Sequence, residues 1–416
     1  MDASSYGTRD ESSVRYDGWR IVAVCFLVAT FGWAFGFYGQ SVYLAELQRQ
    51  HGWPASLISA GTTFFYLFGA LLVVFVAETV RKFSPRRCMV AGTIAMAAAV
   101  AGLGQVNAPW QLYVADAALA FGWAGMTLAM ISTTLGLWFD LKRGMAISLA
   151  LNGASFGGII GVPLLVAAIS QFGFSRAMIV AAAAMVVVVV PVVLIFVGRP
   201  PLQSSAALAA NGDAVSPAQI RFDALRNIGF LSVTTAFALV LFAQVGFIVH
   251  LIAFLDPVIG RNSAAVALAL LTAMAVIGRV LFSTVIDRLN QRLASALSFV
   301  SQALALLIII NFRNGTLLIA ACAVFGFSVG NLITLPSLIV QREFDARAFG
   351  VLISLLTAIT QITYAFGPGV IGALRDLSEA YTLPFYGCVA LELTATILVL
   401  FRGKAGQAGR DSVSQP

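Results

Sequence analysis

Charged side chains are scarce in this sequence, and their scarcity fixes its broad class. Asp, Glu, Lys and Arg make up 10% of the 416 residues, whereas apolar residues make up 60%. Soluble domains carry roughly 25% charged residues. The composition therefore excludes a water-soluble globular protein and indicates an all-α integral membrane protein that exposes apolar surface to a lipid bilayer. In such a chain, a net charge of +7 reflects on which side of the membrane the cations lie and does not indicate a nucleic-acid partner.

Cysteine and histidine are also rare, with four cysteines and two histidines. The cysteines fall in or beside apolar segments and lack the spacing of a disulfide framework or a metal site. Ser-His-Asp, metal-binding and phosphate-loop patterns are absent from the sequence as well. We therefore expect a protein that is not an enzyme and that holds no cofactor or metal.

Long apolar runs recur along the whole chain. A membrane-spanning helix needs about 20 consecutive apolar residues, and this criterion predicts twelve segments. Their approximate limits are 20–45, 56–78, 88–107, 111–137, 145–171, 176–198, 227–253, 264–286, 293–312, 316–339, 349–373 and 381–401.

The cations are distributed unevenly between the two sides that these spans define. The tails and even-numbered connections carry 19 Lys and Arg, the odd-numbered connections carry 5, and only Arg279 is left over. Cytoplasmic loops are enriched in Lys and Arg. We therefore expect both termini to be cytoplasmic in a multi-pass protein of the plasma or inner membrane.

This topology can be checked by cysteine labelling. Ser205→Cys and Ala405→Cys should remain unlabelled when a membrane-impermeant reagent is added outside, because both positions are expected in the cytoplasm. The same cysteines should react once the membrane is permeabilised. Strong labelling of either position in intact cells would refute the predicted orientation.

A Pro-, Ser-, Ala- and Gly-rich stretch at 199–226 divides the spans into two sets of six and reads as a flexible linker. We accordingly expect a cytoplasmic tail at 1–19, a first half at 20–198, the linker at 199–226, a second half at 227–401 and a second tail at 402–416.

The two halves repeat each other. Residues 139–148 and 344–354 share the pattern F-D-x-[KR], followed by Gly and then by Ile-Ser. The segment 81–87 after span 2 likewise corresponds to 287–292 after span 8. Both pairs lie roughly 206 residues apart. Two parallel six-span halves with a site between them near the bilayer midplane form a transporter design.

These repeated segments resemble the signature of the major facilitator superfamily between spans 2–3 and 8–9. The resemblance implies that the acidic-basic turn Asp287-Arg288 and the basic cluster Arg86-Arg87 take part in a cytoplasmic gate. The first copy departs from the signature, since Arg81 stands where the family usually has Asp.

A narrower resemblance is to the monocarboxylate porter and oxalate:formate antiporter branch. Asp17-Gly18-Trp19 resembles the entry motif of that branch, and residues 138–157 resemble its longer motif. Its members carry an Arg in span 8, eight residues before an Asp, as Arg279 and Asp287 are placed here.

This chain also departs from that branch at charged positions. Ala275 replaces an Asp of animal members, Tyr38 replaces a Lys, and 357–361 lacks the second cation of the oxalate antiporter.

Arg279 is the one charge within the apolar run of span 8. A guanidinium stays protonated, and placing it mid-bilayer costs about 2.5–3.5 kcal/mol on insertion scales. Such a residue marks a substrate path, although snorkelling or pairing with a neighbouring carboxylate is the structural alternative. Its repeat-related position, about Val73, is apolar. We expect Arg279 to bind a substrate carboxylate from the second half while Tyr38 donates a hydrogen bond from the first.

Other polar residues within the spans could converge on the same site, although each could equally make an interhelical hydrogen bond, typically worth about 0.6 kcal/mol. These candidates are Gln40, Asn152, Gln244, Asn331, Gln361 and Tyr364. Candidates for proton coupling are Asp116, His250 and Glu392, which are ionisable groups within or at the ends of spans.

The sequence thus predicts a monomeric secondary transporter that works by alternating access. Its predicted substrate is a small organic monocarboxylate, either lactate- or pyruvate-like or an aromatic acid, and coupling to protons is a further hypothesis. Two alternatives remain open: an exporter of amphipathic compounds, and a non-transporting membrane receptor.

Overall fold

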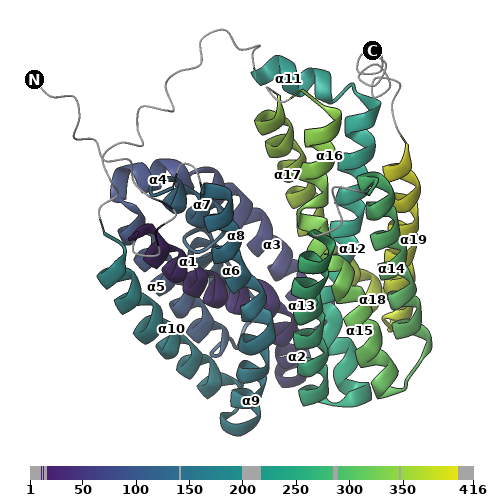
Figure 1. Cartoon of the computed structure of the whole chain (residues 1–416). Coiled ribbons are helices and arrows are strands. Elements are labelled where there is room, and N and C mark those ends of the chain that lie inside the picture. Colours follow the sequence, from purple (N-terminus) through teal and green to yellow (C-terminus); the bar gives the residue numbers. More distant parts are fainter. Residues whose placement is uncertain are drawn as a thin grey trace, which may run out of the picture.

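The computed structural model describes residues 11, 13, 16–139, 142–198, 217–283, 289–345 and 348–401. Helices account for nearly all of these residues, and Figure 1 shows them in two groups. The first group comprises α1 (Gly18–Trp33), η1 (Ala34–Tyr38), α2 (Gly39–His51), α3 (Ala55–Val74), α4 (Val76–Phe83), α5 (Pro85–Leu103), α6 (Pro109–Ala124), α7 (Leu128–Gly136), α8 (Arg143–Phe156), η2 (Gly157–Gly161), α9 (Val162–Phe172) and α10 (Phe174–Phe196). The second comprises α11 (Pro217–Ala224), α12 (Ile228–Ile259), α13 (Arg261–Ser283), α14 (Gln291–Asn311), α15 (Gly315–Val329), η4 (Gly330–Ile333), α16 (Leu335–Glu343), α17 (Phe349–Ala365), α18 (Gly367–Ser378) and α19 (Thr382–Leu400).

Twelve helices of the described chain are long and apolar enough to cross a membrane, which confirms the predicted span count. Most observed limits lie close to the predicted ones; span 9, for example, runs from Gln291 to Asn311. Span 1 is longer than predicted, from Gly18 to His51, because its polar last turns also remain helical. Backbone groups within a bilayer must be hydrogen-bonded internally, and a helix achieves this whatever its side chains.

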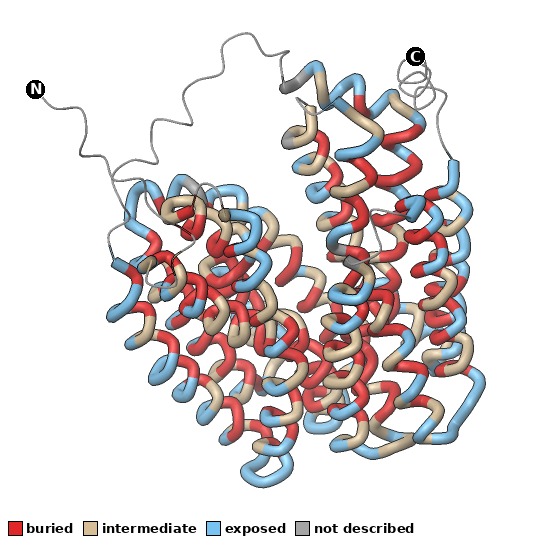
Figure 2. The backbone as a smooth tube through the Cα atoms, viewed as in Figure 1, coloured by how far each residue is buried: buried red, intermediate tan, exposed pale blue. Residues whose placement is uncertain are grey.

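The two groups of helices meet at one end of the molecule and diverge toward the end that carries the described chain ends near Gly18 and Leu400 (Figure 1). We call these the far end and the termini end. Buried residues gather inside each group and where the groups meet (Figure 2). Large apolar side chains on the periphery remain exposed, such as Val187 and Ile195 of α10. An outward apolar surface of this kind suits contact with lipid.

Two π-helical turns face each other inside the first group. The turn η1 interrupts span 1 and the turn η2 interrupts span 5, and the two turns are in contact. A side chain at Gly157 of η2 would collide with the backbone nitrogen of Ala34 in η1, so this approach of the two turns requires glycine. Single π turns within α-helices often occur at functional sites, and η1 ends at Tyr38.

Two predicted features fall partly or wholly on residues that are not described. Asp287 and Arg288, predicted to take part in the gate, lie outside the described residues, as does 199–216 of the predicted linker. The rest of that linker contains α11, which packs against α17.

Candidate functional site

Arg279 lies on α13, a helix that contacts both its own half and the other one. Helix α13 packs against α15 and η4 of the second half and against α8, η2 and α9 of the first. The Arg279 side chain is half-buried, and its Nε donates a hydrogen bond of 3.2 Å to the carbonyl oxygen of Gly330. A side chain at Gly330 would collide with the carbonyl of Ala275, so glycine permits this approach of η4 to α13. The guanidinium is thus held through Nε, and its terminal nitrogens form no hydrogen bond with the described residues.

The structure contains no carboxylate partner for Arg279 among the residues that it describes. The ion pairs found there join Arg20 to Asp17, Glu46 to Arg49 and Arg261, Arg292 to Glu343, and Arg375 to Asp376. Within those residues, the alternative of an arginine neutralised by a neighbouring helix therefore finds no support. An unpaired cation in a membrane span is suited to receive an anion.

Tyr38 lies beside Arg279 from the opposite half. Its side chain is 8% exposed. Its phenol group lies near the guanidinium. The pair predicted from the sequence is thus brought together across the boundary between the halves, with a cation on one side and a hydrogen-bond donor on the other.

The remaining substrate-site candidates are placed unequally around this pair. Asn331 follows Gly330 in η4, is buried, and its Oδ1 has no hydrogen-bond partner within the described chain. Gln40 accepts a hydrogen bond of 2.9 Å from Thr62 through Oε1, and its buried Nε2 has no partner there. Gln244 of α12 is also buried, and its Oε1 has no hydrogen-bond partner among the described residues.

Asn152 of α8 and Gln361 of α17 are half-buried. Over the described ranges, no hydrogen bond or ion pair links Asn152 or Gln361 to Arg279. Tyr364 of α17 instead packs against Tyr66 of α3, a residue that the sequence analysis did not single out. A tyrosine in an apolar helix is not recognisable from the sequence as a site residue. Only its contact with Tyr364 of α17 sets Tyr66 apart.

The three proton-coupling candidates each lie inside one half. The Oδ2 of Asp116 in α6 lies against Gly61 of α3 and has no partner among the described residues. His250 bonds to the carbonyl of Pro368 through Nε2 at 3.0 Å and to the hydroxyl of Tyr381 through Nδ1 at 3.1 Å. A carbonyl only accepts, so Nε2 carries the proton and Nδ1 accepts from the tyrosine.

Glu392 of α19 is fully buried, and neither of its oxygens has a hydrogen-bond partner in the described structure. Helix α19 packs against α12, α14 and α18, which all belong to the second half. Glu392 therefore lies away from the other half, whereas His250 lies two residues from Ile252, whose backbone N–H bonds across the halves to Ser41.

Contacts between the halves close the far end, and we call the following four, all between described residues, the far-end contacts. Glu46 of α2 pairs with Arg261 of α13 at 2.9 Å. The carboxylate of Asp376 in α18 accepts hydrogen bonds from the backbone N–H groups of Ala55 and Ser56, at 3.2 and 2.7 Å, and thereby caps α3. The other two contacts are Ile252 N to Ser41 Oγ and Gly369 N to Thr63 Oγ1, each 3.1 Å.

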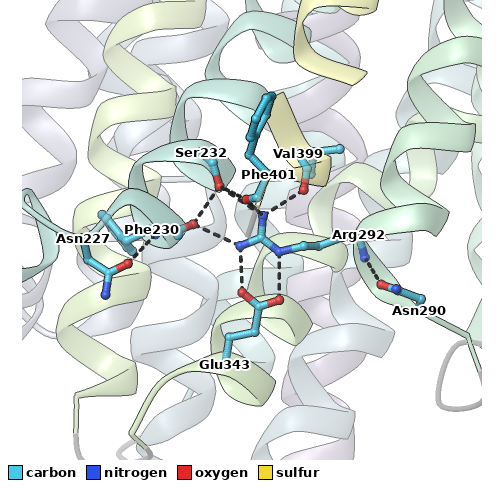
Figure 3. Close-up of polar contacts among 9 residues, drawn as sticks. Asn227, Phe230, Ser232, Asn290, Arg292, Glu343, Val399 and Phe401 are labelled. Atoms are coloured by element: carbon cyan, nitrogen blue, oxygen red, sulfur yellow. Dashed lines mark hydrogen bonds and ion pairs between the residues drawn. The ribbon is translucent and has the colours of Figure 1, made fainter. Parts of the chain in front are cut away.

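At the termini end, the second half is tied together by Arg292 (Figure 3). This side chain is 1% exposed. It forms a fork with Glu343, with Nε to Oε1 at 2.8 Å and Nη2 to Oε2 at 2.7 Å. Its other bonds go to the carbonyls of Gly229, Val399 and Phe401 and to the hydroxyl of Ser232, at 2.8–3.1 Å. One buried arginine thus joins α12, α14, α16 and the end of α19.

The first half has no equivalent network in the described residues. Arg86 and Arg87, predicted to act in a gate, are exposed, and neither belongs to an ion pair within the described ranges. Contacts from the segment before α1 occupy this end instead. Tyr16 donates a hydrogen bond to the carbonyl of Trp138, and Glu11 accepts one of 2.7 Å from the backbone N–H of Lys142.

Comparison with known proteins gives matches over most of the chain. The family model described as Major Facilitator Superfamily matches residues 24–368. The MFS-type transporter pynF of Aspergillus niger is 26% identical over 371 residues, which are 86% of this chain and 81% of that protein. The MFS-type transporter 1 of Ophiocordyceps sp. is 25% identical over 353 residues, 82% of this chain and 74% of that protein.

Solved structures share the fold at lower identity. A bacterial homolog of the human lysosomal transporter Spinster, in an inward-facing and occupied conformation, has a TM-score of 0.73 at 16% identity and covers 93% of this chain and 97% of its own. The nucleoside transporter NupG has a TM-score of 0.73 at 13% identity and covers 93% and 100%. At these identities the likeness concerns the fold alone.

Proposed function

The chain belongs to the Major Facilitator Superfamily, and we propose that this multi-pass membrane transporter carries a small organic monocarboxylate by alternating access of its two halves. The observation that supports this substrate class is Arg279, which has no carboxylate partner among the described residues and lies beside Tyr38 of the other half. A carboxylate can accept two parallel hydrogen bonds from a guanidinium. One available cation favours a monoanion over a dicarboxylate.

The bound anion would bridge the halves, with Arg279 on one side and the Tyr38 hydroxyl on the other. A ligand that contacts both halves favours the conformations in which they lie close together. With the termini in the cytoplasm, as the distribution of Lys and Arg favours, the described conformation is closed outside by the far-end contacts and diverges inside. We further propose a monomer in the plasma or inner membrane, and coupling to protons as a further hypothesis.

Uptake into proteoliposomes tests this function. Radiolabelled lactate, pyruvate and benzoate are offered with and without an imposed pH gradient. We expect saturable uptake of at least one of them, and a higher accumulation with the gradient if protons are coupled. Transport of uncharged amphipathic compounds alone would instead support the alternative of an exporter, and failure of all transport would leave the receptor alternative.

Weakening the far-end contacts should bias the transporter toward an outward-open state. Glu46→Gln removes the charge that pairs with Arg261 across the halves. A loss of about 1.4 kcal/mol from the closed state changes the equilibrium about tenfold. We therefore expect much faster labelling of Ser59→Cys, which is fully buried here, by an impermeant maleimide added outside.

Arg49→Gln is the matched control for this experiment. Arg49 pairs with the same carboxylate at 3.7 Å, but it lies on the same helix and does not join the halves. Labelling of Ser59→Cys should therefore stay near that of the parent protein. Equal labelling rates in the Glu46→Gln and Arg49→Gln backgrounds would contradict a role for the Glu46–Arg261 pair in closing the far end.

A further inference from the structure

Tyr66 carries a buried hydroxyl without a hydrogen-bond partner in the described part of the chain. Its side chain is 3% exposed, so water does not replace the missing partner readily. A buried hydroxyl left unpaired costs about 1–3 kcal/mol, and buried tyrosines usually find a partner. An unpaired hydroxyl at this depth is therefore well placed to meet a ligand.

The Tyr66 ring lies where the halves touch. It packs edge-on against Tyr364 of α17, with ring centroids 5.7 Å apart and an interplanar angle of 85°. Helix α3 belongs to the first half and α17 to the second, and the two helices are in contact. The pair thus forms a cross-half element separate from Arg279.

Aromatic rings connect this pair to the Arg279 site. The Phe37 ring lies 5.0 Å from that of Tyr38 and 6.1 Å from that of Tyr66. Tyr38 in turn lies near both Tyr66 and Arg279. A row of neighbouring side chains therefore leads from the Arg279 guanidinium past Tyr38 and Phe37 to Tyr66 and Tyr364.

A second buried donor without a partner among the described residues lies on α2, which contacts α3. Thr62 lies one helical turn before Tyr66 on α3, and its hydroxyl fixes Oε1 of Gln40 at 2.9 Å. This bond leaves Nε2 of Gln40 as a buried donor with no partner among the described residues. Two buried polar groups, the Tyr66 hydroxyl and the Gln40 amide, therefore lack partners in this part of the first half.

We propose that Tyr66, Tyr364 and Gln40 form a second subsite, which binds an oxygen at the end of the substrate opposite its carboxylate. This inference rests on the proposed function, because it requires the carboxylate to be at Arg279. A three-carbon hydroxy or oxo acid carries its second oxygen beside the carboxylate, near Tyr38. A hydroxylated aromatic acid extends past Phe37 to Tyr66, and its flat ring packs favourably against edges and faces of other rings. The substrate class is therefore an aromatic monocarboxylate with a distal hydroxyl.

Binding of a matched pair of acids tests this subsite. The dissociation constants of benzoate and 4-hydroxybenzoate are measured on purified protein by calorimetry. The parent protein should bind 4-hydroxybenzoate about tenfold more tightly, in line with pairing one buried hydroxyl. In Tyr66→Phe, which keeps the ring contact with Tyr364, the preference for 4-hydroxybenzoate should fall well below tenfold, since the variant lacks one of the polar groups of the subsite.

Tyr113→Phe is the matched control, because Tyr113 lies on α6 and packs against Phe64, outside the subsite. It should keep the preference of the parent protein for 4-hydroxybenzoate. A parent protein that binds both acids equally, or a Tyr66→Phe variant that keeps a tenfold preference, would overturn the subsite. Tighter binding of lactate or pyruvate than of either benzoate would overturn it as well.

The outcomes separate the subsite from the proposed function. If both benzoates bind equally and Arg279→Ala abolishes their binding, carboxylate recognition stands and the distal subsite fails. If no carboxylate binds the parent protein at all, the proposed function itself fails. A Tyr364→Phe variant with an unchanged melting temperature gives a second reading of the preference if Tyr66→Phe proves unstable.

Discussion

Replacement of Arg279 by alanine is expected to abolish measurable uptake of the transported carboxylate while the protein still folds. Folding should survive, because the only hydrogen bond of the Arg279 side chain in the described structure is from Nε to Gly330. Removing a charge from an apolar span also removes a cost of insertion. Loss of one partner from a buried charge pair costs about 2–5 kcal/mol in binding. Affinity should therefore fall by roughly 30-fold to several thousandfold, since each 1.4 kcal/mol is about tenfold.

Arg279→Lys separates charge from geometry at the same position. An ammonium keeps the positive charge but cannot form the planar two-bond fork. It also lacks the Nε that bonds to Gly330. We therefore expect binding much weaker than in the parent protein, with residual affinity above that of Arg279→Ala. Saturable uptake and the dissociation constant measured on purified variants give the two readings.

Arg226→Ala is the control for loss of a cation at the termini end. Arg226 stacks on the Phe222 ring at 3.9 Å, in the segment of α11 and the turn that follows. Its removal should leave uptake unchanged. A folded Arg279→Ala protein that transports a carboxylate with near-normal affinity would contradict the proposed role of Arg279. A substrate without negative charge would do the same.

The difference between Arg279 and Tyr66 shows what the sequence alone can predict. A single charge inside an apolar run is visible in the sequence, because the bilayer makes it costly wherever the helix packs. Tyr66 gains its meaning only from Tyr364, which arrives from a helix in the other half. Its buried hydroxyl is unpaired because of tertiary packing, which no local pattern encodes.

The spans were predictable and the contacts at their ends were not. Bilayer thickness fixes the length of an apolar segment, so span 9 was placed within a few residues of Gln291–Asn311. The far-end pair joins Glu46 to Arg261, and its two members lie in different halves. Each reads in the sequence as an ordinary charge at the end of a span.

Arg292 illustrates the same limit at the termini end. The sequence placed it in a repeated, signature-like segment, beside the predicted gate. The structure shows it buried between four helices. An arginine becomes a structural centre of this kind only when those helices have converged, so its burial could not be anticipated from its neighbours in the chain.

Breaking the Arg292–Glu343 pair should have the largest effect on stability. Arg292→Met leaves the Glu343 carboxylate without its fork and removes the guanidinium donors that reach the carbonyls of Gly229, Val399 and Phe401. Removing one partner of a buried ion pair costs about 3–5 kcal/mol. We expect a large drop in the melting temperature of the purified protein. Arg342→Gln is the control, because Arg342 is exposed and makes one long bond of 3.4 Å to Leu289, so its loss should change stability by only about 0.5 kcal/mol or less.

The double variant shows whether the lone charge causes the loss. Glu343→Gln alone should also destabilise, because it leaves a guanidinium that is 1% exposed without its counter-charge. In the combination of Arg292→Met with Glu343→Gln, no unpaired charge remains. The two losses should therefore be clearly less than additive, with a coupling energy of about 0.5–3 kcal/mol for residues in direct contact. Strictly additive losses would show that Arg292 acts through its carbonyl contacts and its packing, and not through the charge of Glu343.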